Sequence, residues 1–438
     1  MKATTNRKPN NKINIITLGC SKNIADSEHV AGHLRKSGFQ VYFDRDRNDC
    51  DTVIVNTCGF IGDAKEESIN ALLEQIDVKK RGRRQRKIIA IGCLIERYRN
   101  ELASELPEID AFYGVHQWGE LINSLESEYR ESLESERMQS TPKHYAYLKI
   151  SEGCNRQCSY CAIPLIRGKH VSRPIDDIVD EAKKMVSDGV KELILIAQDT
   201  TYYGLDLYGE RRLGTLLERL STESGAEWIR IHYTYPASFP DDAINAIAQH
   251  DNICKYIDIP LQHINSQLLK SMQRGVDKEE TLRLIEKFRR SIPNVALRTT
   301  LIVGYPGESE EDFEELKEFV KTVKFNRLGV FAYSPEEGTA AYKLGDPVDD
   351  EEKQRRVEEL MEIQEKISLE NNESKIGRKY KVLIDRREGD YWVGRTEYDS
   401  PEVDDEVLIK NHPSLREGHF INVEIEEALE HDLIGKVI

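Results

Sequence analysis

The sequence predicts an α/β protein of three consecutive domains. From residue 13 to residue 125, short apolar segments alternate with helical patterns, which indicates a parallel sheet covered by helices on both faces. A second series of six such units starts at residue 145 and predicts a partial (βα)6, TIM-like barrel. After residue 377 the pattern changes to five short strands, which predict a small, OB-like β-barrel. We place the domains at residues 11–127, 140–371 and 373–438.

The composition is that of a globular protein in the cytoplasm. The 438 residues include 62 Lys and Arg against 78 Asp and Glu, for a formal net charge of −16. A chain this acidic is not expected to coat nucleic acid through bulk charge, because phosphate binding requires a positive surface. No apolar run approaches the ~20 residues of a membrane span, and the polar N-terminus lacks a signal peptide. We therefore expect a cytoplasmic protein without membrane contact.

In the first domain, each of three predicted strands ends in a cysteine. The strands are Ile13–Cys20, Asp51–Cys58 and Lys87–Cys93. The carboxyl ends of parallel strands meet at one edge of a sheet, so Cys20, Cys58 and Cys93 should gather there. A single cysteine is usually a small buried hydrophobe, but three at equivalent strand ends indicate a shared site. Cys50 and Cys254 lie at the opposite ends of their strands, and we expect them to fill the core.

The segment Gly153–Cys161 (GCNRQCSYC) carries the strongest chemical signal. Cys154, Cys158 and Cys161 are spaced C-x3-C-x2-C on a loop directly after the first barrel strand. Thiolate-rich sites favour iron–sulfur clusters or zinc. A structural zinc site needs four ligands, and no fourth cysteine is near. We therefore favour a [4Fe–4S] cluster with one open iron over a zinc knuckle.

This motif resembles that of the radical S-adenosylmethionine enzymes, over Tyr145–Asn371. In that family the open iron chelates the amino and carboxylate groups of S-adenosylmethionine, and one electron cleaves it to a 5′-deoxyadenosyl radical. With PLIRGKHVSRP (Pro164–Pro174), the chain further resembles the methylthiotransferases, which join a three-cysteine domain, a radical core and a TRAM barrel. The resemblance implies a second [4Fe–4S] cluster on Cys20, Cys58 and Cys93, whose open iron can carry the transferred sulfur. It also implies an electron donor such as flavodoxin or ferredoxin.

Other polar residues near predicted strand ends are candidate contacts of S-adenosylmethionine. Gln198 and Asp199 end the second barrel strand, near where the family holds the methionine amino group. Arg298 is placed at the end of the fifth strand. Polar side chains at such ends often bind ligands, and we expect all three to contact the cofactor. His263 either touches substrate or caps a helix, and no residue is singled out as catalytic.

Two charged segments have simpler interpretations. The basic run Lys79–Lys87 is either a solvated loop, which we favour, or a contact to RNA. Residues 126–143 are charged without an apolar face, and we interpret them as a linker.

Two branches of the methylthiotransferases share all six cysteines, and one modifies tRNA adenosine. NTCGFI (Asn56–Ile61) and ISEGCNRQCSYCAIP (Ile150–Pro164) resemble more closely the branch that modifies an aspartate of small-subunit ribosomal protein uS12. Residues 377–438 carry nine Lys and Arg against fifteen Asp and Glu, a net charge of −6. Such a barrel is expected to repel tRNA and suit a basic ribosomal protein. We thus predict that the chain adds –SCH3 to the β-carbon of that aspartate in uS12, free or in the ribosome. The alternatives are the tRNA modifier and, in another class, an iron–sulfur electron carrier or scaffold.

Overall fold

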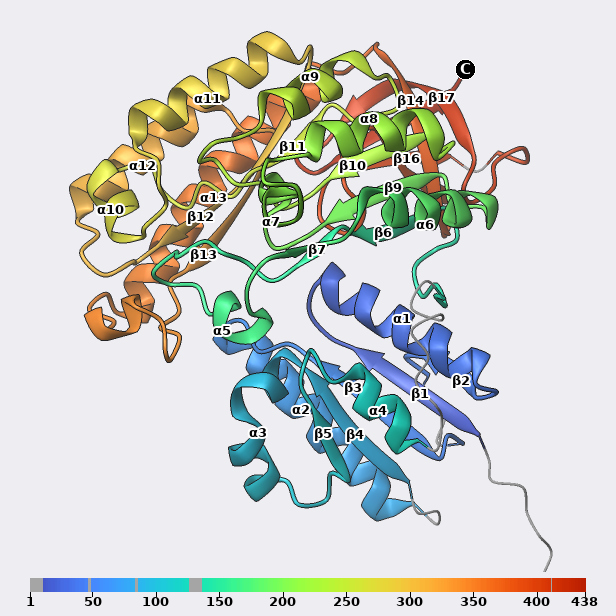
Figure 1. Cartoon of the computed structure of the whole chain (residues 1–438). Helices are drawn as coiled ribbons and strands as arrows, with labels where there is room; N and C mark the ends of the chain where they lie inside the picture. The colour runs from blue at the N-terminus through green and yellow to red at the C-terminus, as the bar shows by residue number, and fades with distance from the viewer. Residues whose placement is uncertain (1–10, 46–48, 83–85, 126–135, 411) are drawn as a thin grey trace, which may run out of the picture. The chain divides into compact units, whose positions relative to one another are not determined.

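The structure is a computed structural model that describes the chain except for residues 1–10, 46–48, 83–85, 126–135 and 411 (Figure 1). It divides into two units, Met1–Thr141 with Ala162–Lys169, and Pro142–Cys161 with His170–Ile438. The predicted fold class is confirmed, because the structure contains a parallel-sheet α/β domain, a half-open barrel of six parallel strands and a closed five-stranded barrel. No helix in the described residues is both long and apolar enough to span a membrane.

The first unit is built on a parallel sheet of order β2-β1-β3-β4-β5. Its strands are Lys12–Thr17 (β1), Gln40–Phe43 (β2), Thr52–Thr57 (β3), Lys87–Gly92 (β4) and Ala111–Tyr113 (β5). Its main helices are Ser21–Lys36 (α1), Gly62–Arg81 (α2), Cys93–Glu105 (α3) and Trp118–Ser124 (α4). Alternate strand residues feed two separate cores, with α1 and α4 on one face and α2 and α3 on the other. This arrangement explains why the strands are apolar throughout.

Residues 136–141 of the predicted linker belong to the first unit instead. Glu28 on α1 is buried and accepts hydrogen bonds from the Ser140 hydroxyl (2.8 Å) and from Arg137. Met138 packs against one of the two cores. A buried carboxylate must be paired, so the polar side chains of this segment are held in place despite its lack of an apolar face. Residues 126–135 of the predicted linker lie outside the described residues.

In the second unit, six parallel strands form the half-open barrel in two groups of three. Their bounds are Tyr145–Lys149 (β6), Glu192–Ile196 (β9), Trp228–Ile231 (β10), Tyr256–Asp258 (β11), Ala296–Val303 (β12) and Arg327–Ala332 (β13). A bridge between Ile229 and Ile253 joins the two groups. The short strands Ser151–Glu152 (β7) and Val171–Ser172 (β8) pair as a hairpin.

Helices alternate with the barrel strands close to where the apolar periodicity predicts them. They are Ile175–Ser187 (α6), Leu205–Tyr208 (α7), Leu213–Glu223 (α8), Asp241–Gln249 (α9), Ser266–Ser271 (α10), Lys278–Ser291 (α11), Glu310–Val323 (α12) and Asp350–Glu373 (α13). Capping boxes fix two of the starts, because Asp277 and Ser309 each exchange hydrogen bonds with the residue three positions on. The short helix Ile163–Arg167 (α5) belongs to the first unit.

The C-terminal barrel closes in the order β14-β15-β16-β18-β17 and packs on the core strands of the same unit. Its strands are Lys379–Glu388 (β14), Tyr391–Arg395 (β15), Glu406–Lys410 (β16), Phe420–Ala428 (β17) and Asp432–Val437 (β18). Trp228, Tyr256 and Ala296, which begin three core strands, cluster with Leu383 of β14. The barrel therefore covers the amino ends of the core strands, opposite the ends that lead into the cysteine loop. Cys254 lies in this cluster, which confirms its role as core filler, and Cys50 is also buried.

Candidate active site

The first unit brings Cys20, Cys58 and Cys93 to one edge of its sheet. Cys20 precedes α1, Cys58 follows β3, and Cys93 begins α3 directly after β4. Their strands β1, β3 and β4 are adjacent in the sheet. The backbone beside Cys20 lies against the second thiol, since a Cβ placed on Gly19 would be 2.9 Å from the Cys58 sulfur. All three are free thiols.

One glycine next to this edge has no room for a side chain. Gly92, between β4 and Cys93, has φ +100° and ψ −159°, a region essentially restricted to glycine. A Cβ there would lie 2.4 Å from the Asn56 side-chain oxygen and 2.6 Å from the Thr57 carbonyl oxygen. The turn that presents Cys93 therefore depends on this glycine.

Gly92→Ala is expected to lower the free energy of unfolding by about 1–3 kcal/mol and to reduce the iron bound by the first unit. Thermal unfolding and iron analysis of the reconstituted chain measure the two effects. Gly189→Ala is the matched control, because Gly189 also has positive φ (+112°) but nothing within 4 Å of an added Cβ. Iron binding equal to that of the parent would show that the turn does not place Cys93.

A buried ionic network adjoins Cys93. Arg167, at the end of α5, donates to the Asp26 carboxylate (2.8 Å), the Asn23 side-chain oxygen (2.7 Å) and the Cys93 sulfur (3.4 Å). Burial raises the pKa of the Cys93 thiol to about 12, and the Arg167 charge acts in the opposite direction. Sequence reasoning did not single out Arg167, although it lies within the segment Pro164–Pro174 that carries the family resemblance. Its three partners are more than 70 residues away in sequence, so local patterns could not reveal these contacts.

In the second unit, Cys154, Cys158 and Cys161 lie on the loop after β7 and are partly buried. Arg156, inside the loop, forms an ion pair with Asp199 (2.7 Å) and stacks on the ring of Tyr235 at 3.9 Å. Burial raises the pKa of the Cys154 thiol to about 11. Arg156 thus ties the loop to the barrel through Asp199 and Tyr235.

The two predicted cofactor contacts after β9 have different surroundings. The Gln198 amide nitrogen donates to Glu152 (2.9 Å), and its oxygen is buried with no hydrogen-bond partner in the described part of the chain. Such an oxygen can accept a hydrogen bond from an ammonium group. The Asp199 carboxylate is already occupied by Arg156 and by the backbone and hydroxyl of Thr201. Asp199 therefore holds the cysteine loop rather than presenting a free carboxylate.

The prediction that Arg298 ends its strand is wrong. Arg298 is the third of the eight residues of β12, and its guanidinium reaches Asp404 (2.5 Å) in the C-terminal barrel and Asp258 (3.8 Å). Arg298 therefore forms ion pairs near the amino end of its strand, away from the cysteine loop. The polar run Arg298–Thr300 suggested a strand end, but the strand continues through Leu301–Val303.

His263 supports the start of a helix without capping it, because the side chain of Asn265 caps α10. Its Nδ1 accepts the backbone N–H of Asn265 (3.0 Å), the N-cap residue of α10, and the ring is fully buried. Burial lowers the pKa of His263 to about 4. The native imidazole is therefore neutral at pH 7.

A loss of stability below pH 6.5 follows from this imidazole. Between the ordinary pKa of 6.5 and the native value of about 4, the unfolded chain binds a proton that the native chain does not. The contribution of His263 is complete above pH 6.5, and about 2 kcal/mol of it is lost at pH 5. Urea unfolding of the iron-free chain at pH 7 and pH 5 should show that His263→Asn loses about 2 kcal/mol less than the parent. Equal losses in both proteins would contradict a buried neutral imidazole.

The donor sets of both cysteine sites fit an iron–sulfur cluster. In the described residues, no three His, Cys, Asp or Glu side chains converge as the ligands of a single metal ion would. A cubane cluster instead holds its thiolates around a body of four irons and four sulfurs, so they need not meet at one point. Three cysteines on each of two sites, without a fourth cysteine nearby, suit such a cluster with one open iron.

The basic run Lys79–Lys87 is partly neutralised. Lys79 pairs with Asp110 and Lys80 with Glu108, both at 2.7 Å, at the end of α2. Arg86 is buried, so it is not part of an exposed loop. Residues 83–85 lie outside the described residues. The described basic residues therefore favour a structural role over a contact to RNA.

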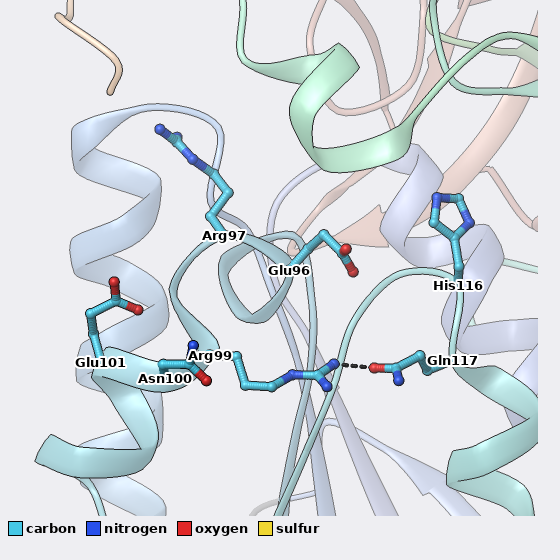
Figure 2. Close-up of a pocket in the computed structure, with 7 residues that line it drawn as sticks. All are labelled: Glu96, Arg97, Arg99, Asn100, Glu101, His116 and Gln117. Carbon is cyan, nitrogen blue, oxygen red and sulfur yellow. Dashed lines mark hydrogen bonds between the residues drawn. The ribbon is translucent and has the colours of Figure 1, made fainter. Parts of the chain in front are cut away.

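A polar pocket of about 480 Å³ lies on the first unit beside α3. Figure 2 shows Arg99 reaching across it to the side-chain oxygen of Gln117, with Glu96 and His116 on its walls. None of the six candidate cysteines lines this pocket. It is thus separate from the cysteine site of this unit.

Comparison with known proteins agrees with the three-part architecture. Residues 12–114 match the Uncharacterized protein family UPF0004, residues 148–320 match the Radical SAM superfamily, and residues 376–438 match the TRAM domain. The radical S-adenosylmethionine methyltransferase TsrM from Kitasatospora setae aligns with a TM-score of 0.55 at 13% identity, over 86% of this chain and 79% of that chain. This likeness shows a shared fold.

Curated relatives are similar over almost the whole chain. The ribosomal protein uS12 methylthiotransferase RimO of Phocaeicola vulgatus is 54% identical over 98% of this chain and 99% of its own length. The protein of the same name from Bacteroides thetaiotaomicron is 54% identical over 98% of both chains, and that from Cytophaga hutchinsonii is 50% identical over the full length of both. The chain therefore belongs to the family of ribosomal protein uS12 methylthiotransferases.

Proposed function

We propose that the chain replaces a hydrogen on the β-carbon of an aspartate in ribosomal protein uS12 with a methylthio group. The observation that carries this proposal is 54% identity over 98% of the chain to proteins named for methylthio transfer to uS12. The two sites of three cysteines support it, because the reaction needs a radical generator and a sulfur donor.

The residues divide these tasks between the two units. Cys154, Cys158 and Cys161 would hold the [4Fe–4S] cluster of the radical reaction, and the open oxygen of Gln198 would accept a hydrogen bond from the amino group of S-adenosylmethionine. Cys20, Cys58 and Cys93 would hold a second [4Fe–4S] cluster that carries the sulfur. One molecule of S-adenosylmethionine would supply the radical that removes the hydrogen, with methionine released, and a second molecule would supply the methyl group, with S-adenosylhomocysteine released. An external one-electron donor, such as flavodoxin or ferredoxin, would supply the electron.

The net charge of the C-terminal barrel does not by itself decide the substrate. Several of its acidic groups are turned toward the core, where Asp399 and Asp405 pair with Arg327, and Asp404 pairs with Arg298. These paired carboxylates neither repel RNA nor attract a basic protein. The exposed surface of the barrel is therefore less negative than the net charge of its sequence indicates. The choice of uS12 over tRNA therefore rests on the similarity to the relatives.

Mass spectrometry of a strain lacking the gene tests the substrate. The aspartate-containing uS12 peptide should lose the mass of the methylthio group in the deletion strain and regain it when the full chain is restored. A chain with Cys154→Ala is the control, because it should be produced without restoring the modification. Loss of methylthio-adenosine from tRNA with unchanged uS12 would contradict the proposal and favour the tRNA modifier.

A further inference from the structure

A buried arginine of the barrel is directed at one sulfur of the cysteine loop. Arg274 follows α10 and is 3% exposed. Its Nη1 lies 3.3 Å from the Cys158 sulfur and 3.2 Å from the Tyr160 hydroxyl, and its Nη2 donates to the carbonyl oxygen of Pro260. Both terminal nitrogens are therefore engaged, one of them by a candidate cluster ligand.

Tyr235 holds this guanidinium in place. Its hydroxyl donates to the Arg274 carbonyl oxygen (2.7 Å) and lies 3.6 Å from the Cys158 sulfur. Its ring lies 4.2 Å from the Arg274 guanidinium carbon and 3.9 Å from that of Arg156. Cation–π contacts are strongest where the cation is desolvated, as it is here. The direction of the Arg274 fork is thus determined by packing.

Arg274 and Arg167 differ in their counter-charges. Arg167 contacts the Cys93 sulfur at 3.4 Å but also forms an ion pair with Asp26 at 2.8 Å. Across the described residues, no carboxylate forms an ion pair with Arg274, whose surroundings are Cys158, Tyr160 and Tyr235. The cysteine loop therefore faces a full positive charge, whereas the charge beside Cys93 is largely offset.

We propose that Arg274 is a positioning residue that raises the reduction potential of the cluster on Cys154, Cys158 and Cys161 above that of the cluster on the other three cysteines. The proposal rests on the function proposed above. Reduction adds one electron, and hydrogen bonds and positive charge at a ligand sulfur stabilise the more negative state. Low local polarity strengthens this effect, because a buried charge is poorly screened. An electron from the external donor would then go preferentially to the radical site.

The reduction potential of each site can be measured in the full chain with the other site removed. In a Cys20→Ala, Cys58→Ala, Cys93→Ala background, Arg274→Gln should lower the ratio of reduced to oxidised cluster at a fixed potential by about tenfold, or about 59 mV for one electron. Electron paramagnetic resonance at set potentials gives this ratio. Arg274→Lys should shift the ratio less, because it keeps the charge and loses only the fork geometry.

Two further variants separate electrostatics from general damage. In a Cys154→Ala, Cys158→Ala, Cys161→Ala background, Arg167→Gln should change the ratio less than Arg274→Gln does, because Asp26 already offsets that charge. Arg211→Gln in the first background should change nothing, since Arg211 donates to the Thr201 carbonyl oxygen and not to sulfur.

Several outcomes would overturn the inference. An iron-loaded Arg274→Gln variant with the parent ratio would contradict the role of Arg274 and leave the proposed function intact. A larger shift at Arg167 would contradict the charge argument. If the Arg274→Gln variant binds no iron, the Arg274→Lys variant decides the question. A ratio of reduced to oxidised cluster near that of the parent supports the inference, and a tenfold fall in this ratio refutes it. A parent background without iron would instead contradict the assignment of the loop cysteines and the inference with it.

Discussion

Replacing Cys154, Cys158 and Cys161 with Ala is expected to abolish the cleavage of S-adenosylmethionine. The remaining cysteine site should still bind about four of the ~8 irons that two cubane clusters contain. The reason is that soft thiolates are the only ligands the loop offers, and alanine provides none. Iron analysis and the formation of 5′-deoxyadenosine under reducing conditions measure the two quantities.

The complementary change separates the two sites. With Cys20, Cys58 and Cys93 replaced by Ala, cleavage should continue while methylthio transfer to uS12 stops. Cys50→Ala with Cys254→Ala is the matched control, because both are buried free cysteines outside the two sites, and this variant should keep the parent iron content. Methylthio transfer by the variant without Cys20, Cys58 and Cys93 would show that a cluster on these cysteines does not carry the transferred sulfur.

The positions of Cys20, Cys58 and Cys93 could be predicted because each follows the end of a parallel strand. In a parallel sheet every strand ends at the same edge, so the apolar runs that end at Cys20, Cys58 and Cys93 were enough to group them. The loop cysteines are local in sequence, so their spacing alone predicts that they lie together. Both kinds of signal rely on regular elements rather than on tertiary detail.

The remaining contacts depend on tertiary packing, which leaves little trace in local sequence. Arg274 meets Cys158 across 116 residues, and Arg167 meets Asp26 across 141. Arg298 was misplaced for the opposite reason, because a polar run within β12 resembles a strand end when the partners in the C-terminal barrel are unknown. The end of the predicted linker was misread likewise, since its role depends on the buried Glu28.

The net charge of the C-terminal segment also gave no indication of the buried ion pairs between the core and the C-terminal barrel. Arg395 of β15 is buried between two carboxylates, Glu192 of β9 (2.6 Å) and Asp385 of β14 (2.8 Å). Arg230 pairs with the other oxygen of Glu192 at 2.7 Å. Burial opposes ionisation of Asp385, but Arg395 and His144 hold the pKa of its carboxyl below the usual value. The barrel and the core are thus joined by a desolvated charge network.

Arg395→Met is therefore expected to lower the free energy of unfolding by about 3–5 kcal/mol, because it leaves buried carboxylates without their cation. Lys324→Met is the matched control. Lys324 pairs with Glu370 at 2.6 Å, but both side chains are more than half exposed, and such pairs contribute only about 0–1 kcal/mol. Urea unfolding followed by tryptophan fluorescence measures the difference, and one of the three tryptophans, Trp228, lies at this junction with its ring 4.7 Å from that of Phe420.

A double variant distinguishes loss of pairing from loss of packing. Arg395→Met combined with Asp385→Asn removes a carboxylate that has lost its arginine, while Glu192 stays paired with Arg230, so part of the lost stability should return. Recovery of more than about 1 kcal/mol relative to Arg395→Met alone would attribute the loss to unpaired charge. If the double variant is no more stable than the single one, packing of the guanidinium between the core and the barrel, and not its charge, stabilises the junction.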